Sequence, residues 1–201
     1  SRPAAFFDLD RTLLRGASGP AFTAALRSVG VLSDRVLPGE NLIYQVFNLI
    51  GETRPSMMLA RQNARFSGGQ VRAKVQQAGE QAAELLCGMV EPYALSIIRE
   101  HKAAGRPVVL ATTSPYDLVK PFADSLGLDD AIGTRYGITD EGKYDGTIVD
   151  HFVWGPGKLA AVRDWCDAND VDLAASWAYS DSFYDMPLLG AVEHPFVINP
   201  D

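Results

Sequence analysis

The chain has 201 residues, 47% of them hydrophobic, which is enough for a buried core in one domain or in a domain with an insertion. Its 18 basic and 25 acidic residues give a net charge of −7, which disfavours a general nucleic-acid-binding surface. No apolar run reaches the length of a membrane span, and no N-terminal signal indicates secretion. Cys87 and Cys166 lack metal-ligand spacing and are expected to be reduced, buried thiols. We therefore expect a cytoplasmic protein that holds any anionic ligand in a local site.

The first predicted strand ends in two acidic residues. Residues 4–7 have the composition of a buried strand, and Asp8 and Asp10 follow. Side chains two apart on an extended segment point the same way, so both carboxylates should share one small volume. Their repulsion must be offset by a cation, a shared proton or strong hydrogen bonds, and Mg²⁺ suits oxygen ligands best. Taken alone, the pair fits a solvated turn better than a metal site, because Asp is common in turns.

The tract from residue 16 to 90 is predicted to be helical. Apolar residues at helical spacing indicate helices that we expect to contribute to the core: 20–29, then Leu42, Ile43, Val46, Phe47 and Ile50, and finally Val71, Val75, Ala78, Ala82, Leu85, Leu86 and Met89. A helical block inserted after the first strand would form a separate cap. Basic residues of this block could bind substrate, although solvated helix faces often carry such residues; they are Arg54, Arg61, Arg65 and Lys74.

The second half of the chain alternates helices with strands. Residues 107–111 form a predicted buried strand that leads into Thr112 and Thr113. Ser114 is predicted to cap the next helix, with Pro115 as the first helical residue. Hydroxyl and backbone N–H groups at such a strand end could bind phosphate oxygens, and they could equally be only a helix cap.

Three further features lie in the C-terminal third. Residues 132–149 predict a β-hairpin, and Lys158 is placed at the amino end of an amphipathic helix, where the helix dipole disfavours a cation. Another apolar strand ends at Asp181, with Asp185 four residues later, so one carboxylate could reach a metal while the other braces the site. A final strand is predicted at 195–199.

The ordered set of polar strand ends resembles the motifs of one enzyme family. The sequence is similar to the haloacid dehalogenase superfamily of aspartyl phosphatases, within its phosphoserine phosphatase-like subgroup with a helical cap. The four matching motifs are Asp8-Leu9-Asp10-Arg11-Thr12-Leu13, Thr112, Lys158 and Ser180-Asp181-Ser182-Phe183-Tyr184-Asp185. The resemblance implies an α/β fold with a doubly wound, mostly parallel Rossmann-like sheet. The core would comprise residues 1–15 and 91–201, and residues 16–90 would be the inserted helical cap domain.

The resemblance also implies a mechanism. Asp8 would be the nucleophile that forms an aspartyl-phosphate, and Asp10 would be the general acid and base. The implied cofactor is Mg²⁺, held by Asp8, the backbone carbonyl of Asp10 and Asp181, with Asp185 either as a direct ligand or as a support behind the ligands. The groups that would bind the transferring phosphoryl oxygens are Thr112, Thr113 and Lys158. The implied activity is that of a phosphomonoesterase acting on a small phosphorylated metabolite.

Departures from the subgroup concern the substrate. Phosphoserine phosphatases carry a Glu that receives the substrate ammonium, whereas the matching position here is Ala17. Ser182 and Tyr184 replace the usual glycine and asparagine of the fourth motif, and Thr112-Thr113 replaces Ser-Gly in the second. We therefore expect a substrate other than phosphoserine, with phosphoserine itself as the alternative.

Other functional classes fit the sequence less well. A phosphorylated receiver domain also combines acids, a Thr and a Lys, but it has neither an Asp-x-Asp pair nor a helical insertion. The family's dehalogenases lack the second Asp. A non-enzymatic phosphate-binding or regulatory domain fused to another enzyme stays open, although Asp8 and Asp10 argue against it. A further C-terminal domain or a homodimer are the protein partners that the sequence leaves open.

Overall fold

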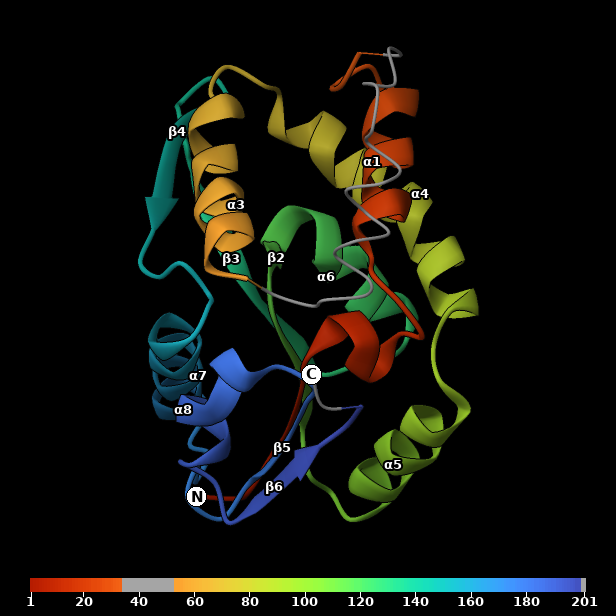
Figure 1. Cartoon of the computed structure of the whole chain (residues 1–201), viewed down its shortest axis with the longest axis vertical. Helices are drawn as coiled ribbons and strands as arrows, with labels where there is room; N and C mark the ends of the chain where they lie inside the picture. The colour runs from red at the N-terminus through yellow and green to blue at the C-terminus, as the bar shows by residue number, and fades with distance from the viewer. Residues whose placement is uncertain (34–52, 200–201) are drawn as a thin grey trace.

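A six-stranded sheet lies at the centre of the computed structural model, which describes residues 1–33 and 53–199. The strand order is β4-β3-β2-β1-β5-β6, and neighbouring strands are parallel except for the antiparallel pair β3 and β4 (Figure 1). The strands are β1 (Ala5–Phe7), β2 (Val108–Pro115), β3 (Asp130–Ile138), β4 (Tyr144–Val149), β5 (Trp177–Ser180) and β6 (His194–Val197). This arrangement confirms the predicted mostly parallel sheet.

Helices cover both faces of the sheet, which confirms the doubly wound prediction. They are α1 (Gly19–Ser28), α3 (Arg54–Phe66), α4 (Arg72–Gly88), α5 (Pro92–Ala103), α6 (Tyr116–Ser125), α7 (Pro156–Ala168) and α8 (Met186–Leu189). Two short turns complete the described elements, η1 (Leu9–Leu13) and η2 (Phe183–Asp185). None of the described helices combines the length and apolar character that crossing a membrane would need.

The apolar run of β1 packs in both directions. Ala5 and Phe7 belong to a hydrophobic cluster shared with α4, α5 and α6, whereas Ala4 and Phe6 belong to a second cluster shared with α7 and α8. Successive strand side chains point to opposite faces, so a strand covered on both sides needs apolar residues at every position. The continuous run at the N-terminus therefore encodes a central strand.

The described part of the inserted tract is helical. In Figure 1, α1, α3 and α4 lie in the upper half of the molecule, beyond the end of β1, while α5, α7 and α8 lie in the lower half. The segments that enter and leave the tract pair with each other: Leu14 bridges Val90, and the Arg15 N–H donates to the Met89 carbonyl at 3.0 Å. The predicted stripe Leu42–Ile50 lies outside the described residues. The domain division at residues 16–90 stays a prediction.

Helix α4 packs directly on helix α6. A Cβ placed on Gly79 would lie 2.8 Å from the Asp117 carbonyl oxygen and 2.9 Å from that of Leu118, so only a glycine permits this close crossing. The expectation that the whole apolar stripe is buried was wrong at two positions. Leu85 is 60% exposed, and Val71, which precedes the helix, is 40% exposed. The contact with α6 determines which face of α4 is buried, and Leu85 and Val71 lie outside that face.

We expect Gly79→Ala to lower the free energy of unfolding by about 1–3 kcal/mol, because the added methyl group meets backbone that can move only by separating the two helices. Gly88→Ala in the same helix is the matched control, since its Cβ would meet no atom of the described residues within 4 Å. Urea unfolding monitored by circular dichroism measures both variants. Equal stability of the two variants would contradict the packing described here.

The antiparallel pair β3 and β4 confirms the predicted hairpin. Its turn is closed by the Thr139 N–H, which donates to the Lys143 carbonyl at 2.8 Å, and Gly142 has a φ of +73°. Thr134 of β3 also pairs with Pro115, after a shift in register along β2.

That last pairing overturns the predicted helix cap. The chain stays extended through Pro115, so helix α6 begins at Tyr116 and Ser114 does not cap it.

Candidate functional site

Three strand ends meet at one edge of the sheet. Phe7 pairs with Leu110 on one side and with Tyr179 on the other. These three paired residues form one row across the sheet. One or two residues after this row come Asp8, Thr112 and Asp181. In parallel sheets this edge is where ligands bind.

The chain leaves the sheet immediately after Asp8. The Asp8 N–H donates to the Tyr179 carbonyl at 2.9 Å, and the turn η1 then begins at Leu9. Asp10 and Arg11 depart from helical geometry within this turn, and Arg11 has a φ of +57°. The expectation of an extended segment through Asp10 was therefore wrong, and a tight turn places the second carboxylate instead.

Asp10 is positioned by the segment that begins the inserted tract. One of its carboxylate oxygens accepts a hydrogen bond from the Ser18 N–H at 2.7 Å. Burial raises the pKa of Asp10 because it disfavours the charged form, while the hydrogen bonds with Ser18 and the positive charge of Lys158 oppose that shift. The effect of Lys158 indicates that Asp10 shares the site with the groups around this lysine.

Lys158 joins two of the predicted site residues. Its Nζ lies 2.8 Å from Asp8 Oδ1 and 2.6 Å from Asp185 Oδ2, and the lysine side chain is fully buried. The preceding turn brings it there: Gly155 has a φ of +54°, and a Cβ on Gly157 would lie 2.1 Å from a backbone oxygen. Lys158 is the third residue of α7, as predicted. A buried cation between two carboxylates outweighs its unfavourable place near the helix amino end.

The fourth motif surrounds the other two acids. The Thr12 hydroxyl donates to Asp181 Oδ1 at 3.4 Å, and Arg11 Nε lies 3.3 Å from Asp181 Oδ2. The Ser180 hydroxyl donates to Asp185 Oδ2 at 2.7 Å. The second oxygen of Asp185, Oδ1, is buried and has no hydrogen-bond partner among the described residues.

The threonine pair occupies the end of β2. Thr112 is 3% exposed, and its hydroxyl oxygen accepts a hydrogen bond from the Ser114 N–H at 3.3 Å. The Thr113 hydroxyl is buried and, within the described residues, has no hydrogen-bond partner. A buried polar group without a partner is costly, so both Thr113 Oγ1 and Asp185 Oδ1 are places where a ligand could supply the missing interaction.

The acids fit a hard divalent cation by their chemistry. Carboxylate and carbonyl oxygens are the donors that Mg²⁺ prefers, and Asp185 has an unpartnered oxygen at the site. Across residues 1–33 and 53–199, however, no three acidic, histidine or cysteine side chains form a ready-made metal cluster. Lys158 and Arg11 hold these carboxylates instead.

Two contacts were missed by the sequence reasoning. Arg11 and Ser180 belong to the quoted motifs but were given no role, and each contacts one of the acids of the fourth motif. Ser180 could have been found from its position at the strand end immediately before Asp181. Arg11 could not, because its contact depends on the left-handed turn.

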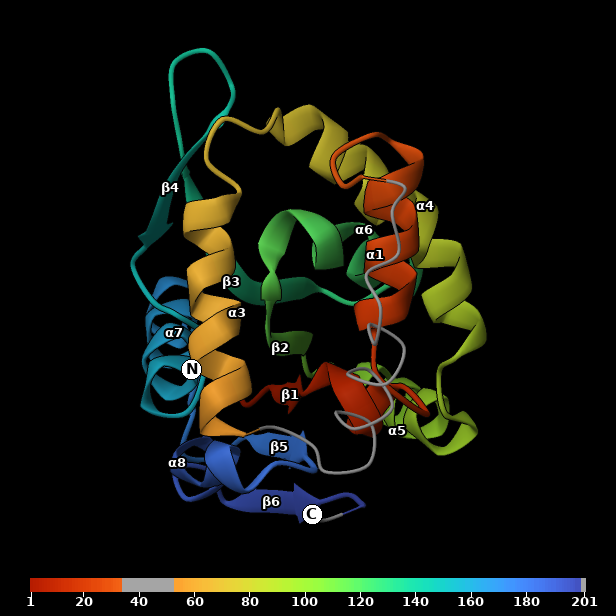
Figure 2. The same ribbon diagram turned by 45° about the horizontal axis from the view of Figure 1, so that its top comes forward.

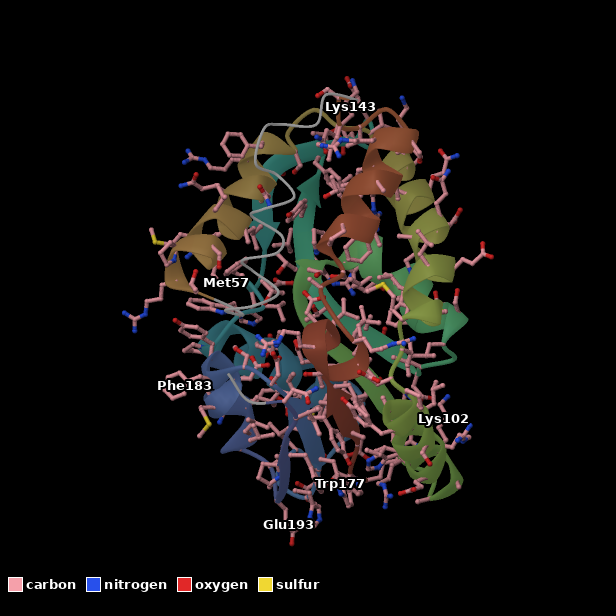
Figure 3. The ribbon with its side chains drawn as sticks, turned by 45° about the vertical axis from the view of Figure 1, so that its right-hand side comes forward. Met57, Lys102, Lys143, Trp177, Phe183 and Glu193 are labelled. Carbon is pink, nitrogen blue, oxygen red and sulfur yellow. The ribbon has the colours of Figure 1, made fainter. Side chains whose placement is uncertain are left out.

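Arg61, one of the basic residues predicted as substrate ligands, lies near an aromatic ring. The Arg61 guanidinium lies 6.0 Å from the centre of the Phe152 ring, two residues before Trp154, so it bridges α3 and the loop that precedes α7. Trp154 in turn packs on Tyr184 with ring centres 4.7 Å apart. Figure 3 shows Phe183 pointing outward at the same side of the molecule as Met57 of α3, and Phe183 is 73% exposed. Figure 2 places α3 in front of the sheet.

Sequence comparison finds relatives along the whole chain. The model of the haloacid dehalogenase-like hydrolase family matches residues 5–190. The inhibition of morphological differentiation protein of Streptomyces azureus is 35% identical over 204 residues, covering 100% of this chain and 73% of that protein. A Mycobacterium tuberculosis protein named a probable phosphatase is 34% identical over 206 residues, covering 100% of this chain and 70% of its own length.

Solved structures share the fold. A Bordetella pertussis Tohama I protein of unknown function superposes with a TM-score of 0.80 at 28% identity, covering 100% of this chain and 92% of that one. A phosphoserine phosphatase in its apo form superposes with a TM-score of 0.63 at 16% identity, covering 97% and 85% respectively. The second likeness concerns the fold alone.

Proposed function

Since the chain belongs to the haloacid dehalogenase-like hydrolase family, we propose that it is a Mg²⁺-dependent phosphomonoesterase acting on a small phosphorylated metabolite. The observation that carries the proposal is the fully buried Lys158 between Asp8 and Asp185. A lysine ammonium against a strand-end carboxylate offers charge stabilisation where a phosphoryl group would transfer. A relative of 34% identity carries the name phosphatase, which supports the same reaction class.

Asp8 is the proposed nucleophile. One of its carboxylate oxygens would form a bond to phosphorus while the bond from phosphorus to the leaving oxygen breaks, giving an aspartyl-phosphate. Its backbone N–H is anchored on β5, and Lys158 holds Oδ1, so the carboxylate is fixed in orientation before substrate arrives. Fixed orientation is the main contribution that a protein makes to phosphoryl transfer.

Asp10 is the proposed general acid and base. Its proton would pass to the leaving oxygen in the first step, and its carboxylate would then accept a proton from the water that attacks phosphorus. That attack breaks the bond to Asp8 and releases inorganic phosphate. Hydrogen bonds from Ser18 hold the Asp10 carboxylate in place for this proton transfer.

The proposed site is completed by the residues that bind phosphate and by a Mg²⁺ ion. Thr112, Thr113 and Lys158 would hold the phosphoryl oxygens, and the buried Thr113 hydroxyl is a donor that has no other partner among the described residues. Asp8, the Asp10 carbonyl, Asp181 and Asp185 would hold Mg²⁺. The bound ion would reduce the repulsion between the nucleophilic carboxylate and the substrate phosphate.

The substrate proposal disfavours phosphoserine, which carries an ammonium group. Ala17 is 5% exposed and replaces the acid that would pair with that ammonium, and a buried ammonium without a counter-ion is costly. We further propose that residues 16–90 act as the cap that selects the substrate, and that the enzyme is cytoplasmic. The alternatives are a phosphoserine phosphatase and a non-enzymatic phosphate-binding domain.

Hydrolysis of p-nitrophenyl phosphate by the purified chain tests the function. We expect turnover with millimolar Mg²⁺ and its loss when EDTA removes the ion, with recovery after Mg²⁺ is restored. A panel of phosphorylated metabolites that includes phosphoserine then ranks substrates, and phosphoserine is expected to rank low. Absence of turnover with every phosphate ester would support the non-enzymatic alternative.

A further inference from the structure

The contact between Arg11 and Asp181 places a second basic side chain at the site, in addition to Lys158. Arg11 Nε lies 3.3 Å from Asp181 Oδ2, and the two side chains are 19% and 8% exposed. The Thr12 hydroxyl donates to the other oxygen of Asp181 at 3.4 Å. An arginine guanidinium cannot be deprotonated in a protein, so it can act as a counter-ion to this carboxylate.

The backbone holds Arg11 in this position. Its φ of +57° lies in the left-handed region, which residues other than glycine, asparagine and aspartate seldom adopt. Its N–H donates to the Gly16 carbonyl at 3.2 Å, and its own carbonyl accepts from the Asn199 amide at 3.2 Å. Both backbone polar groups of Arg11 are therefore hydrogen-bonded, and this backbone conformation directs the guanidinium toward Asp181.

The two cations together offset part of the repulsion between the acids. Lys158 contacts Asp8 and Asp185, and Arg11 contacts Asp181. These three carboxylates are the ones whose side chains the proposed function assigns to Mg²⁺. The charge that a metal ion would supply is thus already supplied, in part, by the chain itself.

We propose that Arg11 is an internal counter-ion of Asp181 that stabilises the metal-free protein and competes with Mg²⁺ for this carboxylate, which makes it a positioning residue that sets metal affinity. The inference rests on the proposed function. A positive charge beside a ligand repels an incoming divalent cation, and Mg²⁺ also demands a near-octahedral set of oxygens that the ion pair disturbs. Removing the guanidinium should therefore tighten Mg²⁺ binding by roughly tenfold.

Isothermal titration of metal-free protein with MgCl₂ tests this inference without any substrate. The main variant is Arg11→Asn, because asparagine tolerates a left-handed φ. Arg11→Lys retains the charge and is expected to stay within about threefold of the wild-type affinity. Arg15→Gln removes a charge from the same segment. Within the described part of the chain, the Arg15 guanidinium donates to the Gly88 carbonyl and not to an acid. This variant is the control for net charge and should bind Mg²⁺ like the wild type.

Thermal melting in EDTA and in Mg²⁺ gives an independent readout. Arg11→Asn should melt at a lower temperature than the wild type in EDTA and should gain more from added Mg²⁺. Unchanged or weaker Mg²⁺ binding by Arg11→Asn overturns the inference, as does equal tightening by Arg15→Gln. If Arg11→Asn does not fold, the Mg²⁺ affinity of Arg11→Lys decides. An affinity clearly tighter than that of the wild type overturns the inference, and an affinity close to that of the wild type supports it. If the wild type and all variants hydrolyse the substrate but none of them binds Mg²⁺, the Mg²⁺ dependence in the proposed function is overturned as well.

Discussion

Asp8→Asn is expected to reduce hydrolysis of p-nitrophenyl phosphate by roughly 10⁴-fold or more, because an amide oxygen cannot replace the nucleophilic carboxylate. The substitution keeps the shape of the side chain, and its Oδ1 can still accept the hydrogen bond from Lys158. The fold should therefore survive, and circular dichroism and unfolding by urea will verify that. The lost activity would then reflect the missing nucleophile and not a defect in folding.

The matched control for this variant is Asp124→Asn. Asp124 is a 58% exposed carboxylate that pairs with Lys120 on the surface of α6. It changes the net charge by the same amount, and its turnover should stay within about twofold of the wild type, as expected for a screened surface pair. If Asp8→Asn retains a tenth of the wild-type turnover, Asp8 is not the nucleophile.

Lys158→Met is expected to lower the free energy of unfolding in EDTA by about 3–5 kcal/mol. Methionine preserves most of the side-chain length, so the main loss is the charge. Asp8 and Asp185 would then be buried carboxylates without their cation, and such groups are costly. Urea unfolding measures the difference, and activity should fall as well because a phosphoryl ligand is removed.

A double variant separates the lost ion pair from lost packing. Lys158→Met with Asp185→Asn removes one of the two stranded charges and should recover part of the stability lost in the single variant. Mg²⁺ should also stabilise Lys158→Met more than it stabilises the wild type, since the ion can compensate the acids. A loss below about 1 kcal/mol in the single variant would show that the buried ion pair contributes little.

The local sequence pattern was sufficient for the elements of the sheet. The apolar run before Asp8 predicted a strand buried on both faces, and Phe6 and Phe7 indeed enter different hydrophobic clusters. The hairpin was predictable because a turn sequence between β-rich segments determines its geometry locally. Errors arose where tertiary packing decides. Leu85 continues the helical spacing of α4 but lies off the face that α6 covers.

The polar strand ends were predictable for the same reason. Asp8, Thr112 and Asp181 each follow an apolar strand, and the parallel topology places them along one edge of the sheet. The contacts among side chains were not predictable. Lys158 is 150 residues from Asp8 in sequence, and only the fold shows that it is buried between two acids. The contact of Arg11 depends on a left-handed backbone that the sequence alone does not specify.

The most direct test of the account is to trap the covalent intermediate during turnover. The enzyme is mixed with p-nitrophenyl phosphate and Mg²⁺, quenched in acid and treated with borohydride, which reduces an aspartyl-phosphate to homoserine. Peptide mass spectrometry then locates the reduced residue. We expect homoserine at position 8 in the wild type and none in Asp8→Asn. Active enzyme that yields homoserine at another aspartate, or at none, would contradict the assignment of Asp8 as the nucleophile.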